Sequence, residues 1–581
     1  MNGQQFGPQL TKAGVTFNLW APEAKRVDVV IGEPQPMTRG DHGWFRLQVK
    51  DAQVGCLYRF RIDGELDIPD PASRFQPSDV AGPSEVIDHA AYHWQTSDWR
   101  GRPWQDVVFL ETHVGTFTPQ GSHREMIGRL DHLVSTGITA LELMPLADFP
   151  GRWNWGYDGV LWYAPDSLYG RPDDLKALID AAHARGLMVF LDVVYNHFGP
   201  EGNYLGHIAP SFFSRASTPW GNAINFCVRE VRRFAIESAL QWLRDYRFDG
   251  LRLDAVHAIT NESETHLLHE LSSAVGALAA STGRHIHLVL ENDDNVASLL
   301  DPVTDPPRGK YRAQWNDDYH HAWHRLLTDE THGYYRDYAE PLNRLVRILR
   351  SGFAYQGEPS PHRRGALRGE RSGELSPTAF VNFLQNHDQI GNRVFGDRLT
   401  AEPITLEAAL AITLLAPMPP LLFMGEEWGA TSPFPFFCDF AAPLADAVRR
   451  GRREEFSDAY KKHGDDIPDP LNEATFRSAI LDWSAVAKPA AQKRLALVQR
   501  LLAIRHAEIV PHLDDCRFGD ACAEDGILSA HWNFGDHYRL SLTANLSQRN
   551  ITPPALPFGR TIWGKPAQPL PAWAVVWTMD R

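Results

Sequence analysis

The stretch RPDDLKALIDAAHARGLMVFLDVVYN, residues 171–196, joins two patterns that decide the fold. Residues 171–186 carry a helical pattern, and residues 187–196 form a near-continuous apolar run. Such runs are typical of parallel strands that are buried on both faces of a sheet. A helix that leads directly into a buried strand therefore predicts an α/β fold with parallel strands.

The same alternation extends outward over residues 106–427. Helical patterns at residues 124–137 and 227–246 separate further strand-like runs. Those runs are residues 107–115, 140–146, 250–255, 287–292, 313–316, 379–388 and 420–427. Together with residues 187–196 they make eight strands with helices between them, which predicts a (β/α)8 TIM barrel.

The two ends of the chain carry a different pattern, of short alternating β runs. Between residues 1 and 95 these runs are punctuated by Gly, Pro and Asp at the spacing of a sandwich. Similar runs recur over residues 511–581. We therefore expect a multidomain chain in which antiparallel β-sandwich domains at residues 1–95 and 511–581 flank a barrel at residues 96–510 with small insertions.

Composition excludes several classes of partner. The 581 residues are 43% hydrophobic and 22% charged, which is ordinary for a soluble globular protein. The net charge of −15 disfavours nucleic acid and anionic membrane as partners, because both are negatively charged. The most apolar window, residues 408–424, contains Pro417, Pro419 and Pro420 and does not predict a membrane span.

The cysteines and the N-terminal residues indicate in which cellular compartment the protein is expected. The five cysteines are scattered and include no CxxC pair, so neither a disulfide framework nor a structural zinc site is expected. The first residues lack the basic and apolar segments of a signal peptide. These features predict a cytoplasmic protein.

Polar side chains follow four of the predicted strands at the point where each strand ends. In barrel enzymes these C-terminal ends form the active site. The candidates are Asp192, Asn196 and His197; Arg252, Asp254 and His257; Glu291, Asn292 and Asp293; and Asn386, His387 and Asp388. A single Asp after a strand is usually a helix cap, but four such groups at one mouth predict a catalytic site.

The three carboxylates Asp254, Glu291 and Asp388 indicate glycoside hydrolysis. That reaction needs one carboxyl group to protonate the leaving oxygen and another to attack or to activate water. Arg252 lies two residues before Asp254 and points the same way, so we expect it to keep Asp254 ionised. Glu291 follows an apolar run, so burial is expected to keep it protonated. Structural salt bridges at the barrel rim are the alternative.

Four motifs carry a resemblance to a known superfamily. DVVYNH (192–197), GLRLDAVH (250–257), Glu291 and FLQNHD (383–388) resemble, in order, the four sequence regions of the α-amylase superfamily. The resemblance implies that Asp254 is the nucleophile, Glu291 the acid/base, and Asp388 the group that supports the distorted sugar. It also implies that Arg252, His197 and His387 bind substrate, and that Tyr157 is the aromatic platform. It likens the N-terminal domain to a carbohydrate-binding module.

Further segments indicate which family within this superfamily the sequence resembles. WNDDYHHAWH (315–324), ENDDN (291–295), FAYQG (353–357) and FFCDF (436–440) are similar to the maltooligosyltrehalose trehalohydrolase family. Such enzymes cut the α-1,4 bond next to a terminal trehalose unit, so the resemblance implies this oligosaccharide as substrate and the enzyme that synthesises it as functional partner. It implies no metal or other cofactor, since 54 residues between His197 and Arg252 leave little room for a calcium-binding insert. A glycogen branching enzyme and a non-catalytic sugar-binding homologue are the alternatives.

The remaining candidates are expected to contact sugar. Trp153 and Trp155 predict a stacking wall, with loop packing as the alternative. The cluster of His320, His321 and His324 could hold a metal, but the resemblance favours sugar contacts there. The full set of expected contacts is Trp153, Trp155, Tyr157, His197, Arg252, His257, Asn292, Asp317, Asp318, His320, His321, Asn386, His387, Gln389, Asn392 and Trp428, with Phe436 as an alternative to Trp428. Direct attack by Asp254 predicts retention of configuration, with its carboxyl group roughly 5–5.5 Å from that of Glu291.

Overall fold

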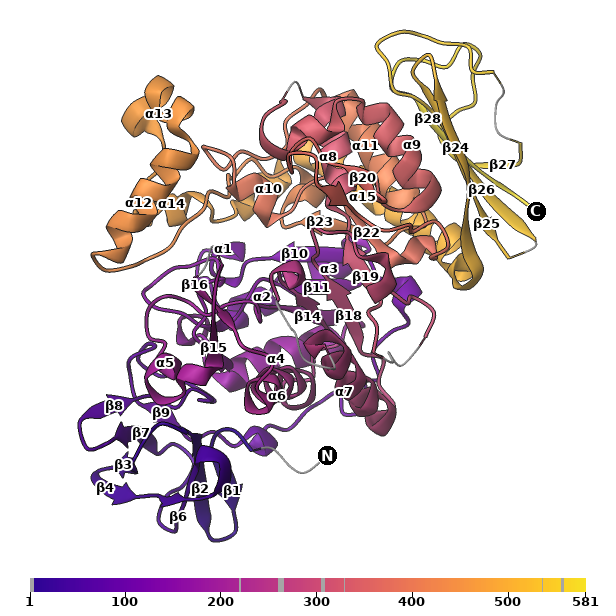
Figure 1. The fold of residues 1–581 in the computed structure, drawn as a ribbon. Helices are drawn as coiled ribbons and strands as arrows, with labels where there is room; N and C mark the ends of the chain where they lie inside the picture. The colour runs from indigo at the N-terminus through magenta and orange to yellow at the C-terminus, as the bar shows by residue number, and fades with distance from the viewer. Residues whose placement is uncertain are drawn as a thin grey trace.

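A computed structural model describes residues 5–218, 221–259, 266–304, 309–328, 330–535, 537–554 and 558–581. A barrel occupies the centre of the molecule, between a β domain at the N-terminus and a β-sheet at the C-terminus (Figure 1). None of the described helices is long and apolar enough to cross a membrane.

Eight parallel strands close the barrel, as predicted. In order around the barrel they are β10 (Phe109–Thr112), β11 (Ala140–Leu143), β14 (Met188–Val193), β17 (Gly250–Leu253), β18 (His287–Leu290), β19 (Ala313–Trp315), β22 (Phe380–Phe383) and β23 (Pro420–Phe423). The strand β10 pairs with both β11 and β23, which completes the ring. The stretch that decides the fold becomes helix α4 (Pro172–His183) and strand β14.

Each strand contributes alternate side chains to the barrel interior, and their character changes toward the C-terminal ends. The layer nearer the N-terminal ends is apolar and includes Phe109, Ala140 and Phe190. Two residues further along the same strands stand Glu111, Glu142 and Asp192, all buried. The strand register sets Glu111 opposite Glu142 and Asp192 opposite Arg252, so charged groups from neighbouring strands meet in one layer.

The N-terminal domain is a sandwich of two antiparallel sheets, as predicted. One sheet contains β1 (Gln9–Thr11), β2 (Gly14–Trp20), β6 (Trp44–Val49) and β5 (Thr38–Arg39), and the other contains β4 (Glu33–Pro36), β3 (Val27–Ile31), β7 (Leu57–Ile62) and β8 (Leu66–Ile68), with β9 (Ser84–Glu85) on β7. Phe17 and Tyr58 pack between the sheets with ring centroids 4.7 Å apart. Phe6 packs edge-on against Phe234 of helix α6 (Arg229–Asp245), which joins the sandwich to the barrel.

The C-terminal domain is antiparallel, as predicted, but its second layer is helical. In the part of residues 516–580 that the structure describes, β24 (Cys516–Glu524), β25 (Ile527–Phe534), β26 (Tyr538–Asn545), β28 (Val575–Asp580) and β27 (Arg560–Trp563) form a single sheet. One face joins the main core against helices α9 (Pro341–Ser351) and α11 (Pro403–Leu415). The barrel helices therefore bury the apolar face that a second sheet was expected to cover.

A helical insertion follows the last barrel strand. It consists of α12 (Leu444–Glu455), α13 (Ser457–His463) and α14 (Glu473–Ser478), and it precedes α15 (Pro489–Ile504). The insertion projects to one side of the barrel (Figure 1). Ala445 of α12 is buried against Cys438 and Phe440, which fixes the base of the insertion beside the barrel mouth.

Candidate active site

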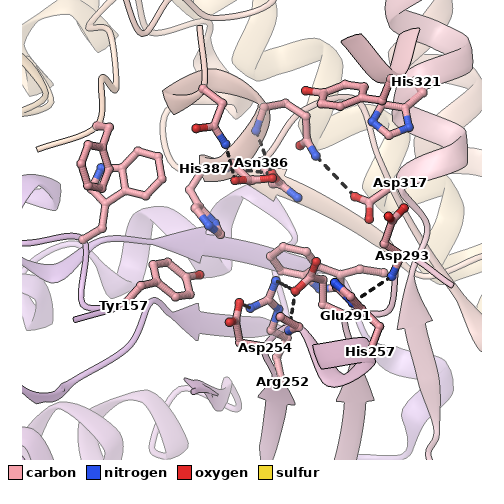
Figure 2. Close-up of a pocket in the computed structure, with 18 of the residues that line it drawn as sticks. Tyr157, Arg252, Asp254, His257, Glu291, Asp293, Asp317, His321, Asn386 and His387 are labelled. Carbon is pink, nitrogen blue, oxygen red and sulfur yellow. Dashed lines mark hydrogen bonds and ion pairs between the residues drawn. The ribbon is translucent and has the colours of Figure 1, made fainter. Parts of the chain in front are cut away.

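A pocket of about 510 Å³ opens at the C-terminal ends of the barrel strands (Figure 2). The structure brings most of the predicted site residues to its lining. They are Trp155, Tyr157, His197, Arg252, Asp254, His257, Glu291, Asp293, Asp317, His321, Asn386, His387, Asp388, Gln389 and Asn392, together with Phe436. Tyr157 lies on one side of the pocket, and Asp293, Asp317 and His321 lie on the opposite side.

Arg252 of β17 forms the centre of the charged layer at the pocket floor. Its Nη1 contacts Oδ2 of Asp192 at 2.7 Å and Oδ1 of Asp254 at 2.8 Å. Its Nη2 lies 3.4 Å from Oε2 of Glu291, which also accepts a hydrogen bond from the backbone N of Ala255 at 2.6 Å. One guanidinium thus fixes the two carboxyl groups that the sequence predicts to be the nucleophile and the acid.

Burial dominates the electrostatics of this pair. The side chains of Asp254 and Glu291 are only 13% and 21% exposed, and this exposure faces the pocket. Burial raises the pKa of both above the ordinary values, and Arg252 opposes that rise in both. Arg252 acts on Asp254 in the expected direction, because it favours the charged form, while burial acts against it. The closer contact of Arg252 with Asp254 favours the proton on Glu291.

Asp388 stands on a short helix that follows β22. This helix, α10 (His387–Gly391), begins at Asn386, whose side chain accepts hydrogen bonds from the backbone N of Asp388 and Gln389. Asn392 donates a hydrogen bond from Nδ2 to Oδ1 of Asp388 at 2.6 Å. Asp388 is exposed to the pocket, so its second oxygen can reach a bound sugar.

An aromatic and histidine wall covers the other side. The ring of Tyr157 stacks on His387 with centroids 5.0 Å apart, and its hydroxyl donates to Asp192 at 2.5 Å. His387 Nδ1 lies 2.5 Å from Oε1 of Glu111. Burial lowers the pKa of His387, but the charge and hydrogen bond of Glu111 outweigh burial and raise it overall. The wall therefore combines a flat apolar face with a histidine that favours its charged form.

Two arginines form the opposite end of the pocket. Arg363 contacts Oδ2 of Asp293 at 2.6 Å, and Arg368 contacts Oδ1 of the same carboxylate at 3.1 Å. Burial raises the pKa of Asp293, but Arg368 and Arg363 outweigh it and lower the pKa overall. Tyr334 tilts over the ring of His321 with centroids 4.4 Å apart. This end presents fixed charges and one aromatic face.

Five predicted contacts lie outside the pocket lining, and each has a packing role. Trp153 is buried and stacks on Phe476, and Trp428 is buried against Trp483. Asn292 accepts a hydrogen bond from the backbone of Asp294. Asp318 accepts hydrogen bonds from Asn295 and from the backbone of Ala354, and His320 contacts the carbonyl of Leu384 and the hydroxyl of Tyr335. None of these five side chains lines the pocket.

The pocket also contains side chains that sequence reasoning did not assign to it. They are Trp315, Tyr334, Asp337, His362, Arg363, Arg368 and Arg452, and Glu111 lies behind His387. Glu111 carried one signal in the sequence, since it is a carboxylate within an apolar strand and must find a buried partner. Among the described residues, no group of three or more His, Cys, Asp or Glu side chains could hold a metal ion.

Comparisons with known proteins identify the family to which a chain with this fold and site belongs. Residues 73–211 match the family described as alpha amylase, catalytic domain, and residues 5–75 match carbohydrate-binding module 48, the isoamylase N-terminal domain. The chain is 43% identical to a malto-oligosyltrehalose trehalohydrolase from Deinococcus radiodurans, over 86% of this chain and 82% of that protein. It is 39% identical to one from a Rhizobium species, over 92% and 91% of the two chains. The chain belongs to the malto-oligosyltrehalose trehalohydrolase family.

Two further comparisons bear on this family assignment. A solved structure of an α-amylase-like protein from Salmonella typhimurium is 41% identical and superimposes over all of both chains with a TM-score of 0.93. A 1,4-alpha-glucan branching enzyme from Mycolicibacterium paratuberculosis is 34% identical, but over only 42% of this chain and 37% of that enzyme. The likeness to the branching enzyme is therefore partial, whereas the trehalohydrolases match most of the chain.

Proposed function

We propose that this chain hydrolyses the α-1,4 bond next to the terminal trehalose unit of maltooligosyltrehalose and releases trehalose with retention of configuration. The observation that carries the proposal is the contact of Arg252 with both Asp254 and Glu291 in the pocket of a chain from this family. Family membership supports the substrate, and the carboxyl pair supports the chemistry.

In the first step, Asp254 attacks the anomeric carbon of the glucose on the non-reducing side of the scissile bond. Glu291 gives its proton to the glycosidic oxygen, so the trehalose leaves as a neutral alcohol and a glycosyl ester remains on Asp254. In the second step, Glu291 takes a proton from water, which attacks the anomeric carbon, breaks its bond to Asp254 and restores the free carboxylate. Arg252 stabilises the carboxylate of Asp254 before attack and after release.

Retention follows from the closeness of the two carboxyl groups. Asp254 and Glu291 contact neighbouring nitrogens of a single guanidinium. Retaining glycosidases hold the groups roughly 5–5.5 Å apart, whereas inverting enzymes leave roughly 6.5–9.5 Å for a water molecule. The shared guanidinium supports the shorter separation. Proton NMR of the product within the first turnovers should therefore show the α-anomer of the released glucan end.

The reacting sugar is proposed to lie on Tyr157, with Asp388 accepting hydrogen bonds from its hydroxyl groups. The stacked pair of Tyr157 and His387 offers an apolar face of the kind that packs against a glucose ring. His197 lines the pocket and contacts the backbone carbonyl of Tyr157 at 2.9 Å, so it fixes the platform from behind.

The arginine end is proposed to bind the leaving trehalose. Asp293 follows the acid Glu291 by two residues, so groups at this end lie beside the departing oxygen. Arg363 and Arg368 hold Asp293 in one orientation, which suits a rigid, bent α,α-1,1 disaccharide. A linear maltose unit would leave buried polar groups unpaired, at a cost of about 1–3 kcal/mol for each group.

One product analysis tests this function. The purified protein is incubated separately with maltopentaose, amylose and maltotriosyltrehalose. We expect free trehalose, released fastest from maltotriosyltrehalose. New α-1,6 branches in amylose would assign the chain to the branching enzymes instead, and equal cutting of maltopentaose would leave a general α-glucanase.

We also propose a cytoplasmic location and a functional partner. Cys56, Cys227, Cys438, Cys516 and Cys522 are free thiols, which supports a reducing compartment. The substrate has an α,α-1,1 link at the end of an α-1,4 chain, so a synthase must first convert the terminal α-1,4 link into an α,α-1,1 link. That maltooligosyltrehalose synthase is the proposed partner in the reaction sequence. Fractionation of cells that express the protein at its native level would test the location.

A further inference from the structure

The helix α10 is too short to hold itself in place. It has five residues, yet it carries three side chains of the pocket, His387, Asp388 and Gln389. A single helical turn is unstable without external contacts, because few hydrogen bonds form for the backbone that is fixed. The position of Asp388 therefore depends on whatever holds the two ends of α10.

The N-terminal end is held from within the same loop, by the side chain of Asn386. The C-terminal end is held from the helical insertion. Arg452 of α12 donates a hydrogen bond from Nη2 to the carbonyl of Gly391 at 3.2 Å and from Nη1 to Oδ1 of Asn392 at 3.4 Å. A guanidinium at the end of a helix satisfies carbonyl groups that have no partner in the helix and complements its dipole.

The side chain of Asn392 connects Arg452 to the carboxylate of Asp388. Because Arg452 only donates, it binds the oxygen of the Asn392 amide and leaves the amide nitrogen free to point elsewhere. That nitrogen donates to Oδ1 of Asp388 at 2.6 Å. The orientation of one amide thus links a guanidinium on the insertion to a carboxylate in the pocket.

Arg452 is itself firmly placed. Its side chain is 16% exposed and pairs with Glu455 on the next turn of α12. Its guanidinium lies over the rings of Phe456 and Phe436, at 4.6 and 5.3 Å from their centroids. On the other side of α10, a Cβ added to Gly391 would overlap the ring of Trp155. The short helix is therefore enclosed between Trp155 and Arg452.

We propose that Arg452 is a positioning residue, which orients Asp388 through Gly391 and Asn392 and so makes the helical insertion part of the catalytic machinery. The inference rests on the role given above to Asp388. It predicts that loss of Arg452 slows the chemical step while substrate still binds, because a misplaced catalytic group costs rate more than affinity.

The first experiment separates positioning from direct binding. Arg452→Ala should lower kcat about 10- to 100-fold with KM changed by less than about threefold, and Arg452→Lys should recover part of the rate. Arg450→Ala is the matched control, since Arg450 is exposed on the same helix, and it should match the parent enzyme. A rise in KM with kcat unchanged would overturn the proposal in favour of a direct sugar contact. A loss of kcat that thermal unfolding traces to a partly unfolded protein would also count against it.

The second experiment is a double-mutant cycle between Arg452→Ala and Asn392→Ala. Residues that act through one path are not additive, so the double variant should be about as slow as the slower single variant. Multiplied losses would refute the link. Rates are read on whichever of maltopentaose, amylose and maltotriosyltrehalose the parent enzyme turns over fastest. The identity of that substrate tests the proposed function, and the cycle tests Arg452 separately.

Discussion

Two layers of the barrel interior differ although the same strands build both. In the lower layer, the rings of Phe109 and Phe190 pack edge to face with centroids 4.9 Å apart. In the upper layer, two residues further along, Glu111 contacts His387 and Asp192 contacts Arg252. The strand period of two projects both sets inward, so backbone geometry cannot explain the difference between the layers.

The difference shows that the two layers contribute differently to the stability of the fold and to the site. The lower layer removes apolar surface from water and stabilises the fold. The upper layer buries charged groups, at a cost that is only partly offset by pairing. Glu142 illustrates that cost, since neither of its carboxylate oxygens has a hydrogen-bond partner among the described residues. Substitutions of the paired groups in the upper layer should therefore change activity, whereas substitutions in the lower layer and at Glu142 should change stability.

The largest effect is expected at the carboxyl pair, which lies directly above the upper layer and is held by its Arg252. Asp254→Asn should lower kcat by at least about 10⁴-fold, because the proposed nucleophile is lost. Glu291→Gln should lose most activity on maltotriosyltrehalose but keep the first step on a maltosyl fluoride, since fluoride leaves without a proton, whereas the second step still lacks its base. The rate of the initial release of trehalose or of fluoride, measured before steady state, tests this. Equal losses on both substrates in the Glu291 variant would contradict its assignment as the acid.

The next effect belongs to the lower layer and should spare activity. Phe190→Ala removes a buried ring that lies over Gly250 and should destabilise the protein by about 3–5 kcal/mol. Thermal unfolding measures the loss, and kcat at a temperature well below Tm should stay within about threefold of the parent. A kcat that fell as far as in the Asp254 variant, with Tm unchanged, would erase the distinction between the two layers.

A smaller effect is expected at Glu111, behind the pocket wall. Glu111→Gln removes the charge that raises the pKa of His387, so the alkaline limb of the profile of kcat/KM against pH should move to lower pH. The rate at pH 7 should fall about tenfold, because a hydrogen bond to a charged group is weakened. The exposed Glu125→Gln serves as control. An unshifted alkaline limb would show that the charge of His387 plays no part.

The smallest effect tests the cost of the upper layer directly. Burial, with Glu111 and Asp192 nearby, raises the pKa of Glu142, so above the unfolded pKa the folded state binds more of this proton than the unfolded state does. The free energy of unfolding therefore falls as pH rises above the pKa that Glu142 has in the unfolded chain. Glu142→Gln should therefore raise Tm by about 1–3 °C at pH 7 and leave it unchanged near pH 4, as scanning calorimetry would measure. A decrease in Tm at pH 7 would show that the carboxyl group is a stabilising contact.

Much of the fold was predictable because the strands are buried on both faces and read as apolar runs. Even β19, only three residues long, pairs with both neighbours as expected. The layer over the C-terminal sheet was not predictable, since its apolar face is the same whether helices or strands cover it. Glu111 was missed for a similar reason, because its partner His387 is 276 residues away and no spacing relates them.

Within the site, the sequence identified the right segments more reliably than the right faces. In helix α8 (Asp317–Leu327), Asp317 and His321 are four residues apart and both line the pocket. Asp318 and His320 lie on other faces of the same helix and point into the protein. Reading DD and HH as pairs overlooked the helical period. Trp153 and Trp155 stand outside any strand or helix, so no period relates them, and only Trp155 lines the pocket.

The enclosure of α10 by Arg452 also constrains how relatives of this chain can be recombined. The loop that carries Asp388 and the insertion helix that carries Arg452 are 60 residues apart in the sequence but meet in one hydrogen-bonded contact. A chimera that exchanges only one of the two segments would join an active-site loop to a foreign support. If Arg452 positions Asp388 as proposed, the two segments must be exchanged together, because a crossover between them separates Arg452 from Gly391 and Asn392.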